Sequence, residues 1–380
     1  MKKQSNTPKI RFHNYKELWE CDDLKNIFGT IRNAFVGTAT PYYVEKGHFY
    51  LESNNVKNGK INYNSQIFIN DEFYEKQRDK WLKTNDIVMV QSGHVGHTAV
   101  IPKELNNTAA HALIVFTDYK KEVNPHFLNY QFQSSSKRKK LDLISTGNTI
   151  KHILASEMKS FKMDFPTVEE QSAIGSLFRT LDALLTSYKD NLANYQSLKA
   201  TMLSKMFPKA GQTVPEIRLD GFEGEWEEKK LGSLGSVAMN KRIFKDETSN
   251  YGDIPFYKIG TFGGTADSFI TKEKFKEYKE KYPYPEIGDI LISASGSIGR
   301  TVVYNGEDAY YQDSNIVWLK HDQKLDNSYL KQYYGIIKWS GIEGTTIKRL
   351  YNKNILETNI FLPPSVTEQQ AIGAYFFTLD

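Results

Sequence analysis

The sequence of 380 residues contains a single cysteine, Cys21, and no run of about 18 apolar residues. One cysteine excludes an internal disulfide framework and a cysteine metal cluster. The lack of a long apolar run argues against a membrane-spanning helix, and the N-terminus lacks the pattern of a signal peptide. We therefore expect a protein of the reducing cytoplasm that has no membrane segment.

An excess of either charge is also lacking. The 49 Lys and Arg residues nearly balance the 45 Asp and Glu residues, which leaves a formal charge of +4. So small an excess permits an anionic partner without indicating one. With 39% hydrophobic and 25% charged residues, the composition is that of a folded protein, and the length is sufficient for two domains.

Recognisable catalytic sequences are absent. The chain has no Asp-Pro-Pro-Tyr or Asn-Pro-Pro-Tyr run of an amino-methyltransferase, no GxGxxG turn after a strand and no GxxxxGK[ST] loop. The glycine-rich segment 260–264 is not followed by a helical pattern, so we predict a turn there. We expect no catalytic residues and no bound cofactor in this chain.

The chain is instead rich in internal repetition. Residues 166–182 (PTVEEQSAIGSLFRTLD) and 364–380 (PSVTEQQAIGAYFFTLD) are identical at eleven of seventeen positions, at a shift of 198. Three further pairs match at shifts of 207, 203 and 197: 8–24 with 215–231, 85–101 with 288–304, and 147–151 with 344–348. The sequence therefore predicts a duplicated unit of about 200 residues, and a pseudo-two-fold molecule is its natural result.

Each copy combines strands with a long helix. We predict β-strands at residues 67–69, 86–90, 112–116, 290–293 and 316–319. A helix should begin after Pro166, with Thr167 as N-cap and Glu170 completing a capping box, and continue to Pro208. The predicted fold class is α+β, with two mixed α/β units separated by long helices.

Apolar residues recur along the first long helix at the spacing of a coiled coil. The residues expected to pair helices are Ile174, Leu177, Leu181, Leu185, Tyr188, Leu192, Tyr195 and Met202, with Ile372, Phe376 and Leu379 in the second copy. Duplication favours two helices that pair antiparallel. The alternative is an amphipathic helix that packs on its own domain.

A loop with two glycines recurs at residues 91–97 (QSGHVGH) and 294–300 (ASGSIGR), and the residues between the glycines differ. Glycine allows a tight turn and a close approach of the backbone to a partner. The variable positions can then differ in what they contact. A structural hairpin with a solvent-facing tip is the alternative.

Three histidines are candidate metal ligands: His94, His97 and His111. Flanking glycines place the first two in a turn, without the helical spacing of a zinc protease. The second copy has Ser297 and Arg300 at their positions. We therefore expect no metal site.

Two related units suggest a ligand with two half-sites, and double-stranded DNA is the obvious one. The positions that we expect to contact DNA are Ser92, His94, His97, Ser295, Ser297 and Arg300 in the loops, and Lys57, Lys60, Lys151, Lys241, Arg242, Lys348 and Arg349 around them. The basic run 136–140 (SKRKK) is more typical of a solvated helix end than of a phosphate site.

The repeated Glu-Gln helix entries, Glu170-Gln171 and Glu368-Gln369, together with the GDIxxxxxGxxG segment at 288–299, resemble the specificity subunit of type I restriction-modification systems. The resemblance covers essentially the whole chain. It implies a first target recognition domain at 1–164, a spacer helix at 165–208, a second target recognition domain at 209–362 and the start of a second conserved helix at 363–380.

The resemblance also implies partners. Each recognition domain of that family binds one half of a bipartite DNA sequence, and the paired helices dock two modification (methyltransferase) subunits, which restriction (endonuclease and translocase) subunits join. S-adenosylmethionine, ATP and Mg are expected on those partner subunits and none of them on this chain.

Family members complete the second helix, whereas the printed sequence stops at Asp380, so we expect that helix to be truncated. Self-association through the exposed first helix is left open. Two other functions stay open as well: a stand-alone enzyme with an unrecognised site, and a scaffold whose units bind proteins.

Overall fold

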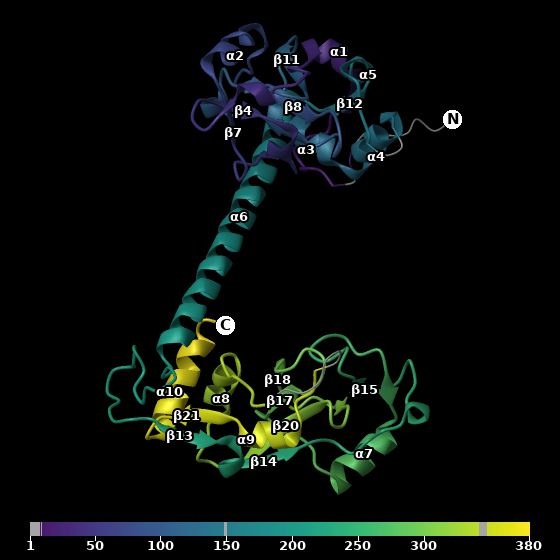
Figure 1. The fold of residues 1–380 in the computed structure, drawn as a ribbon. Helices are drawn as coiled ribbons and strands as arrows, with labels where there is room; N and C mark the ends of the chain where they lie inside the picture. The colour runs from purple at the N-terminus through teal and green to yellow at the C-terminus, as the bar shows by residue number, and fades with distance from the viewer. Residues whose placement is uncertain (1–7, 9, 148–149, 342–347) are drawn as a thin grey trace. The chain divides into compact units, whose positions relative to one another are not determined.

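The structure is a computed structural model that describes residues 8, 10–147, 150–341 and 348–380. The chain divides into two compact units, Met1–Tyr188 and Lys189–Asp380. The long helix α6 (Val168–Lys205) begins in the first unit and ends in the second (Figure 1). Its bounds confirm the predicted helix between Pro166 and Pro208.

The first unit is built on a four-stranded antiparallel sheet in the order β2-β11-β8-β9. These strands are β2 (Phe28–Asn33), β8 (Ile87–Val90), β9 (Thr98–Val100) and β11 (Leu113–Tyr119). All four residues of β8 are buried: Ile87 and Met89 face one apolar cluster, Val88 and Val90 another. This explains why the strand reads as a continuous apolar run.

Smaller elements complete this unit. A second sheet has the order β10-β4-β7-β3, and the pairs β1-β12 and β5-β6 stand apart from it. These strands are β1 (Glu20–Asp23), β3 (Tyr43–Val44), β4 (His48–Leu51), β5 (Val56–Lys57), β6 (Lys60–Ile61), β7 (Ile67–Ile69), β10 (Ala109–Ala110) and β12 (Lys162–Phe165). The helices are α1 (Leu24–Ile27), α2 (Asp71–Glu75), α3 (Pro125–Gln133), α4 (Ser135–Ile144) and α5 (Ala155–Met158).

The second unit has the same plan, with its main sheet in the order β14-β20-β17-β18. Its other sheets are β16-β15-β19 and β13-β21. The strands are β13 (Glu227–Lys230), β14 (Gly235–Ala238), β15 (Ile254–Tyr257), β16 (Phe269–Ile270), β17 (Ile290–Ser293), β18 (Thr301–Val303), β19 (Tyr310–Tyr311), β20 (Ile316–His321) and β21 (Asn359–Leu362). The helices are α7 (Lys272–Lys281), α8 (Asn327–Tyr334), α9 (Asn352–Glu357) and α10 (Val366–Phe377).

The five predicted strands are all present, with shifts of boundary at three of them: β8 begins one residue later, β11 covers 113–119, and β20 extends to His321. Asp86 lies outside β8 because its carboxylate accepts the backbone N–H of Lys83 over 2.8 Å and closes a turn. Ala112 lies outside β11 because its φ is 53°, which is incompatible with an extended strand. The predicted α+β class is confirmed, because both units mix helices with strands.

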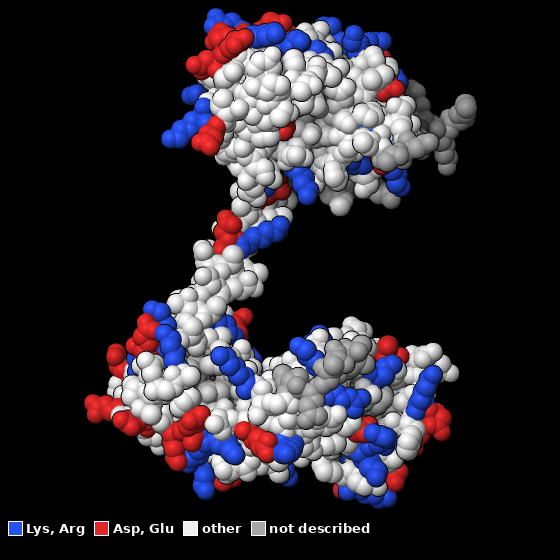
Figure 2. Space-filling model, in the orientation of Figure 1, with Lys and Arg blue, Asp and Glu red and all other residues white. Residues whose placement is uncertain are grey.

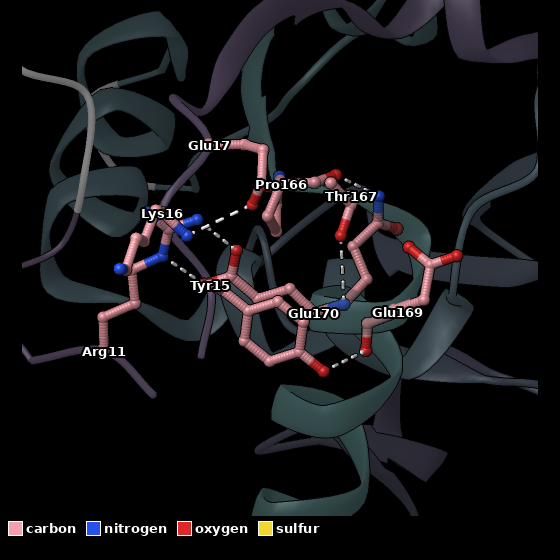
Figure 3. Close-up of polar contacts among 9 residues, drawn as sticks. Arg11, Tyr15, Lys16, Glu17, Pro166, Thr167, Glu169 and Glu170 are labelled. Carbon is pink, nitrogen blue, oxygen red and sulfur yellow. Dashed lines mark hydrogen bonds and ion pairs between the residues drawn. The ribbon is translucent and has the colours of Figure 1, made fainter. Parts of the chain in front are cut away.

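The start of α6 is fixed by a contact that differs from the predicted capping box. Thr167 Oγ1 accepts the backbone N–H of Glu170 over 3.4 Å, so the expected N-cap is present. The Glu170 carboxylate, however, accepts from Arg11 Nε and Nη2 over 2.7 and 2.6 Å (Figure 3). The predicted contact of the Glu170 carboxylate with the backbone N–H of Thr167, which would complete the capping box, is therefore wrong. A guanidinium binds both carboxylate oxygens more strongly than one backbone N–H can.

The start of α10 repeats this arrangement. Ser365 Oγ accepts the backbone N–H of Glu368 over 3.2 Å, and Arg218 Nε and Nη2 each donate to the Glu368 carboxylate over 2.8 Å. In each copy, the arginine of the repeated Ile-Arg and the glutamate of the repeated Glu-Gln thus form a buried ion pair. These contacts tie the segment before β1 to α6 and the segment before β13 to α10.

The glutamine of each entry joins it to a second helix. The backbone N–H of Asn124, the N-cap of α3, donates to Gln171 Oε1 over 3.1 Å. The backbone N–H of Asp326, the N-cap of α8, donates to Gln369 Oε1 over 2.8 Å. Both glutamines are buried. The Glu-Gln sequence therefore has a structural role at two helix starts.

The residues expected to pair helices fall into two sets. Leu177, Leu181, Leu185, Tyr188, Leu192 and Tyr195 form an exposed apolar face along the middle of α6. Ile174 packs against the core of the first unit. Ile372 and Phe376 belong to the core cluster of the second unit, and Met202 and Leu379 pack against it. Coiled-coil pairing of the exposed set stays a prediction.

No helix within the described residues combines the length and the apolar character needed to cross a membrane.

Candidate nucleic-acid interface

The two glycine loops, residues 91–97 and 294–300, join β8 to β9 and β17 to β18. Gly93, Gly96, Gly296 and Gly299 have φ values of 80°, 75°, 65° and 82°. These angles lie in the left-handed region that glycine adopts without strain. The same backbone turn therefore carries different side chains in the two units.

In the first unit, the segment after α4 runs beside its glycine loop. The Gly93 backbone N–H donates to the Lys151 carbonyl over 3.0 Å, and Ser92 pairs antiparallel with His152. Lys151 Nζ lies 3.4 Å from the exposed Asp142 carboxylate. Ser92 and Lys151 are thus brought together, although they are 59 positions apart in the sequence. Residues 148–149 of the predicted turn lie outside the described part of the chain.

The second unit repeats this pairing. The Gly296 backbone N–H donates to the Lys348 carbonyl over 3.3 Å, and Ser295 pairs antiparallel with Arg349. Ser295 Oγ also donates to Asn315 Oδ1 over 2.7 Å. The predicted residues Ser295, Lys348 and Arg349 therefore lie together, although they are 53 and 54 positions apart in the sequence. Residues 344–347 of the matching turn lie outside the described ones.

His97 ends the first glycine loop between two donors. The Asn58 backbone N–H, in the turn between β5 and β6, lies 3.2 Å from His97 Nδ1, and Arg138 Nη2 lies 3.0 Å from it. Both groups can only donate, so Nδ1 is the acceptor and the ring proton is on Nε2. Burial, together with the Arg138 charge, lowers the pKa of His97. A neutral histidine here offers one N–H donor.

The two lysines of the β5-β6 hairpin have different surroundings. Lys57 is exposed, next to the turn that contacts His97. Lys60 Nζ lies 3.7 Å from the Asp182 carboxylate and 3.5 Å from Thr186 Oγ1, both on α6. Lys57 is therefore brought to the loop, whereas Lys60 is oriented toward the helix.

Arg300 ends the second glycine loop and is held by a turn that the sequence predicted. Its Nη1 donates to the Phe262 carbonyl over 2.8 Å, and Phe262 lies in the glycine-rich turn at 260–264. Ser297, at the tip of the loop, is exposed. The guanidinium is thus positioned by a carbonyl and keeps further donors for a ligand.

Arg242 is connected to this loop by the turn at 313–315, because Asp313 binds Arg242 and Asn315 binds Ser295. Its Nε donates to Asp313 Oδ2 over 2.7 Å, two residues before Asn315. Lys241 Nζ lies 5.3 Å from the centroid of the Tyr282 ring, a cation–π contact. A hollow of about 370 Å³ beside the loop is lined by Ser295, Asn315, Arg349 and Lys353, among others.

Two cations near the loops were missed. Arg138 lies in the run 136–140, which we interpreted as a solvated helix end. The Arg138 side chain is half-buried and contacts His97. Lys137, in the same run, is buried, and its Nζ lies 2.7 Å from the Asp164 carboxylate. Only Lys139 and Lys140 of the run are exposed cations. Lys353 had no counterpart in any repeated segment. The contact of Arg138 depends on the fold and leaves no local sequence signal.

The histidines considered as metal ligands do not converge. The His94 and His97 rings lie 6.4 Å apart between centroids, and His111 contacts Glu52 and the Gly37 carbonyl elsewhere in the unit. No group of three or more His, Cys, Asp or Glu side chains within the described ranges is arranged to hold a metal ion. The loops thus offer hydrogen-bond donors and positive charge.

The charge around the loops is local. On the face drawn in Figure 2, Lys and Arg side chains are interspersed with Asp and Glu on both units. The small net charge of +4 is consistent with this mixture. Selective binding of an anion would therefore depend on particular loop residues and not on a broad basic surface.

Both halves of the chain match one known protein family. The family described as "Type I restriction modification DNA specificity domain" matches residues 38–194 and 223–380. The chain belongs to this family. The two matches fall in the two halves of the duplication, on either side of the second part of α6.

Relatives within this type I specificity family show where the similarity lies. A putative type I restriction enzyme specificity subunit of Haemophilus influenzae is 56% identical over 144 residues, which are 38% of this chain and 37% of that protein. A putative specificity subunit of Methanocaldococcus jannaschii is 22% identical over all of this chain and 90% of its own length. The strong match thus spans little more than a third of the Haemophilus protein.

Solved structures share the fold. The S subunit of a type I restriction-modification system from M. genitalium aligns with a TM-score of 0.63 and 16% identity, over 98% of this chain and 92% of its own. A chain from a structural study of complex assembly and conformational transition of the type I R-M system aligns with a TM-score of 0.51 and 17% identity, over 96% and 90%. At these identities the likeness concerns the fold alone.

Proposed function

We propose that this chain is the DNA-recognition subunit of a type I restriction-modification complex and reads a bipartite target, one half with each unit. It supplies specificity and no chemistry of its own. Two modification subunits, which methylate adenine with S-adenosylmethionine, and restriction subunits, which use ATP and Mg, would act where this chain directs them in the cytoplasm.

One observation carries this proposal: the two glycine loops have the same main-chain hydrogen bonds but different side chains. At matched positions the first loop carries His94 and His97, and the second carries Ser297 and Arg300. Ser92 and Ser295 are the same residue type, and Ser295 is buried with its hydroxyl bonded to Asn315. Base edges in the major groove are distinguished by such donors and acceptors, and Arg to guanine is the commonest specific pair. Two such loops can therefore read two different half-sites.

The cations near each loop suit the phosphates. Lys57 and Lys151 in the first unit, and Lys348 and Arg349 in the second, are exposed. Contacts of this kind position a protein on a duplex and supply affinity without sequence preference. Membership of the type I specificity family supports the same function.

The first experiment is a genome-wide map of adenine methylation in cells that express the chain with its modification partner, compared with the partner alone. A new bipartite motif with a fixed spacer is expected. Residues 1–164 are then exchanged for those of a relative with another target, and one half of the motif should change while the other stays.

Other outcomes would favour other functions. An unchanged motif after the exchange would contradict recognition by the first unit. Methyl transfer by the purified chain alone would indicate a stand-alone enzyme. Binding of a protein partner that neither salt nor duplex DNA weakens would indicate a scaffold, because DNA affinity falls steeply with salt.

A further inference from the structure

The side chain that ends each glycine loop contacts the main chain of a second turn. In the first unit this turn joins β5 to β6, and the Asn58 backbone N–H donates to His97 Nδ1 over 3.2 Å. In the second unit it is the turn at 260–264, and Arg300 Nη1 donates to the Phe262 carbonyl over 2.8 Å. His97 and Arg300 are matched at a shift of 203. The same loop position is therefore held by a neighbouring turn in both units.

The two turns correspond at a shift of 204, although the glycine is the only residue that they share. Gly59 and Gly263 have φ values of 80° and 74°. Gly59 pairs with Ala99 of β9, and a Cβ atom at Gly263 would lie 3.3 Å from the side chain of Val302 in β18. Ala99 and Val302 are matched at the shift of 203. Each glycine thus lies against the same position of the strand that follows its loop.

The packing of the turns supports this correspondence. Val56, at the start of the first turn, and Phe262, in the second, each belong to the apolar cluster on one face of the main sheet of their unit. The sheet residues of the two clusters that match at the shift of 203 are Val88 with Leu291 and Val115 with Trp318. The two turns therefore pack on the same face of their sheets.

The main-chain groups that the turns offer have opposite polarity. Asn58 offers an N–H group, which requires an acceptor, whereas Phe262 offers a carbonyl oxygen, which requires a donor. The backbone differs too, because Asn58 has a φ of 51°, in the left-handed region, and Phe262 has no positive φ. A neutral imidazole has one acceptor nitrogen and one donor, and a guanidinium has donors only. An arginine at position 97 would therefore bring donors toward a donor.

Charge near His97 restricts this position further. Arg138 Nη2, from α4, lies 3.0 Å from His97 Nδ1, and the charges of Lys57 in β5 and of His94 in the same loop act on the ring as well. All three groups carry or can gain a positive charge. They disfavour a cation at position 97, whether an imidazolium or a guanidinium.

The second unit has a neutral side chain where the first unit has Arg138. A Cβ atom at Gly96 would lie 3.6 Å from Arg138 Nη1, and one at the matched Gly299 would lie 3.0 Å from Trp339 Nε1. Arg300 follows Gly299 directly and is exposed. The cation that disfavours a guanidinium in the first unit is therefore replaced by an indole in the second.

We propose that the two turns determine which kind of side chain can read a base at the end of each glycine loop, an inference that rests on the proposed function. The turn at Asn58 requires a neutral side chain with an acceptor, and it leaves the Nε2–H of His97 to donate to a base edge. The turn at Phe262 requires a donor, and it orients Arg300 so that Nε and Nη2 can reach the paired acceptors of guanine. Asn58 and Phe262 are thus positioning residues.

The test uses the whole chain with its modification partner and duplexes that carry each base in turn at every position of the first half-site. Glutamine has both a carbonyl acceptor and an N–H donor, so His97→Gln should keep the base preference, with an affinity within about threefold of the unmodified chain. His97→Arg should reduce the preference at one base pair at least about tenfold, because the turn does not hold the guanidinium in position. A preference kept by His97→Arg, or lost equally in both variants, would overturn the proposal.

The same pair of substitutions at His94 is the matched control. His94 is exposed at the tip of the loop, away from the contact with Asn58. His94→Arg should therefore bind at least as tightly as His94→Gln, because an added cation there only strengthens attraction to the phosphates. A weaker His94→Arg would mean that the loop as a whole disfavours a cation and that the turn has no special role.

A second measurement needs no DNA and no variant. In the deuterated, nitrogen-15-labelled chain, NMR should detect a coupling across the hydrogen bond between the Asn58 amide nitrogen and His97 Nδ1. Absence of this coupling would overturn the positioning by Asn58, whatever the DNA preference. An unmodified complex without any preference in the first half-site would instead contradict the proposed function, and the coupling shows separately whether the turn holds His97.

Discussion

Arg218 and Glu368 form a two-pronged ion pair, 2.8 Å at each contact, although they are 150 residues apart. Glu368 is 2% exposed and Arg218 14%. Removing one member of such a pair leaves a charge without a partner in a place from which water is excluded. The pair therefore holds the segment that precedes β13 onto α10.

We expect Arg218→Met to lower the free energy of unfolding of the second unit by about 3 kcal/mol, because the Glu368 carboxylate stays buried without its partner. The double variant Arg218→Met/Glu368→Met should recover part of this loss. Thermal unfolding followed by calorimetry measures both. The control is Lys209→Met, which removes an exposed pair with Glu216 and should change the free energy by at most about 1 kcal/mol. A double variant less stable than the single one would contradict this account.

The matched phenylalanines of the helix entries should respond differently to truncation. Phe376→Ala creates a cavity in the core of the second unit and should cost about 3–5 kcal/mol. Phe178→Ala removes a ring that is already partly exposed and should cost about 1 kcal/mol or less. Calorimetry of the two variants provides the comparison. Equal losses would mean that the two places are packed alike.

His97 should titrate below its ordinary pKa, because burial and Arg138 disfavour the imidazolium. The unfolded chain then binds the proton more readily, so the contribution of His97 to stability is present above about pH 6.5 and is lost as the pH falls below that value. A proton NMR titration of the ring measures this pKa. Arg138→Gln should raise it toward the ordinary value, and a downward shift would contradict the assigned contact.

Lys348 and Arg349 should contribute to DNA affinity through phosphates. Each alanine variant should weaken binding to all sequences alike and reduce the slope of log affinity against log salt by about 1. Lys324→Ala is the matched control, since this exposed lysine lies beyond the opposite end of β20 from Asn315. Salt-dependent binding curves with a target duplex and a scrambled duplex distinguish the cases. A loss confined to the target would mean that the residue reads a base.

Arg300 is the best candidate for reading a base. Arg300→Ala should cost about 1–3 kcal/mol on the target and relax the preference at one base pair of one half-site. Affinities for duplexes substituted at each position of the target provide the measurement. Ser297→Ala, at the neighbouring loop tip, shows whether the effect belongs to the guanidinium or to the loop as a whole.

The sequence predicted the fold well because its main signal was repetition. Each predicted strand of one unit had a counterpart in the other or a local apolar run, and α6 was bounded by Pro166 and Pro208. The partner of Glu170 was predicted wrongly because a capping box is a local pattern, whereas Arg11 lies 159 residues away. The joint recurrence of Ile-Arg and Glu-Gln was the signal that could have revealed it.

The loops were located correctly in sequence, but their neighbours could not be foreseen. The pairing of Gly93 with Lys151, and the approach of Arg138 to His97, depend on how α4 and the following segment fold back. Lys60, which the sequence placed among the DNA contacts, instead lies beside Asp182 of α6. This ion pair depends on where α6 packs, which the sequence around Lys60 does not indicate. Roles of these residues toward DNA remain predictions.

The bonds that hold each glycine loop to its neighbouring segment join main-chain atoms, from Gly93 to Lys151 and from Gly296 to Lys348. Such bonds are indifferent to the side chains that the flanking positions carry. Point mutations at exposed positions such as 94 and 297 can therefore accumulate without loss of the scaffold. A lineage under pressure to change its target could explore new specificities there one residue at a time, and the two halves could diverge independently.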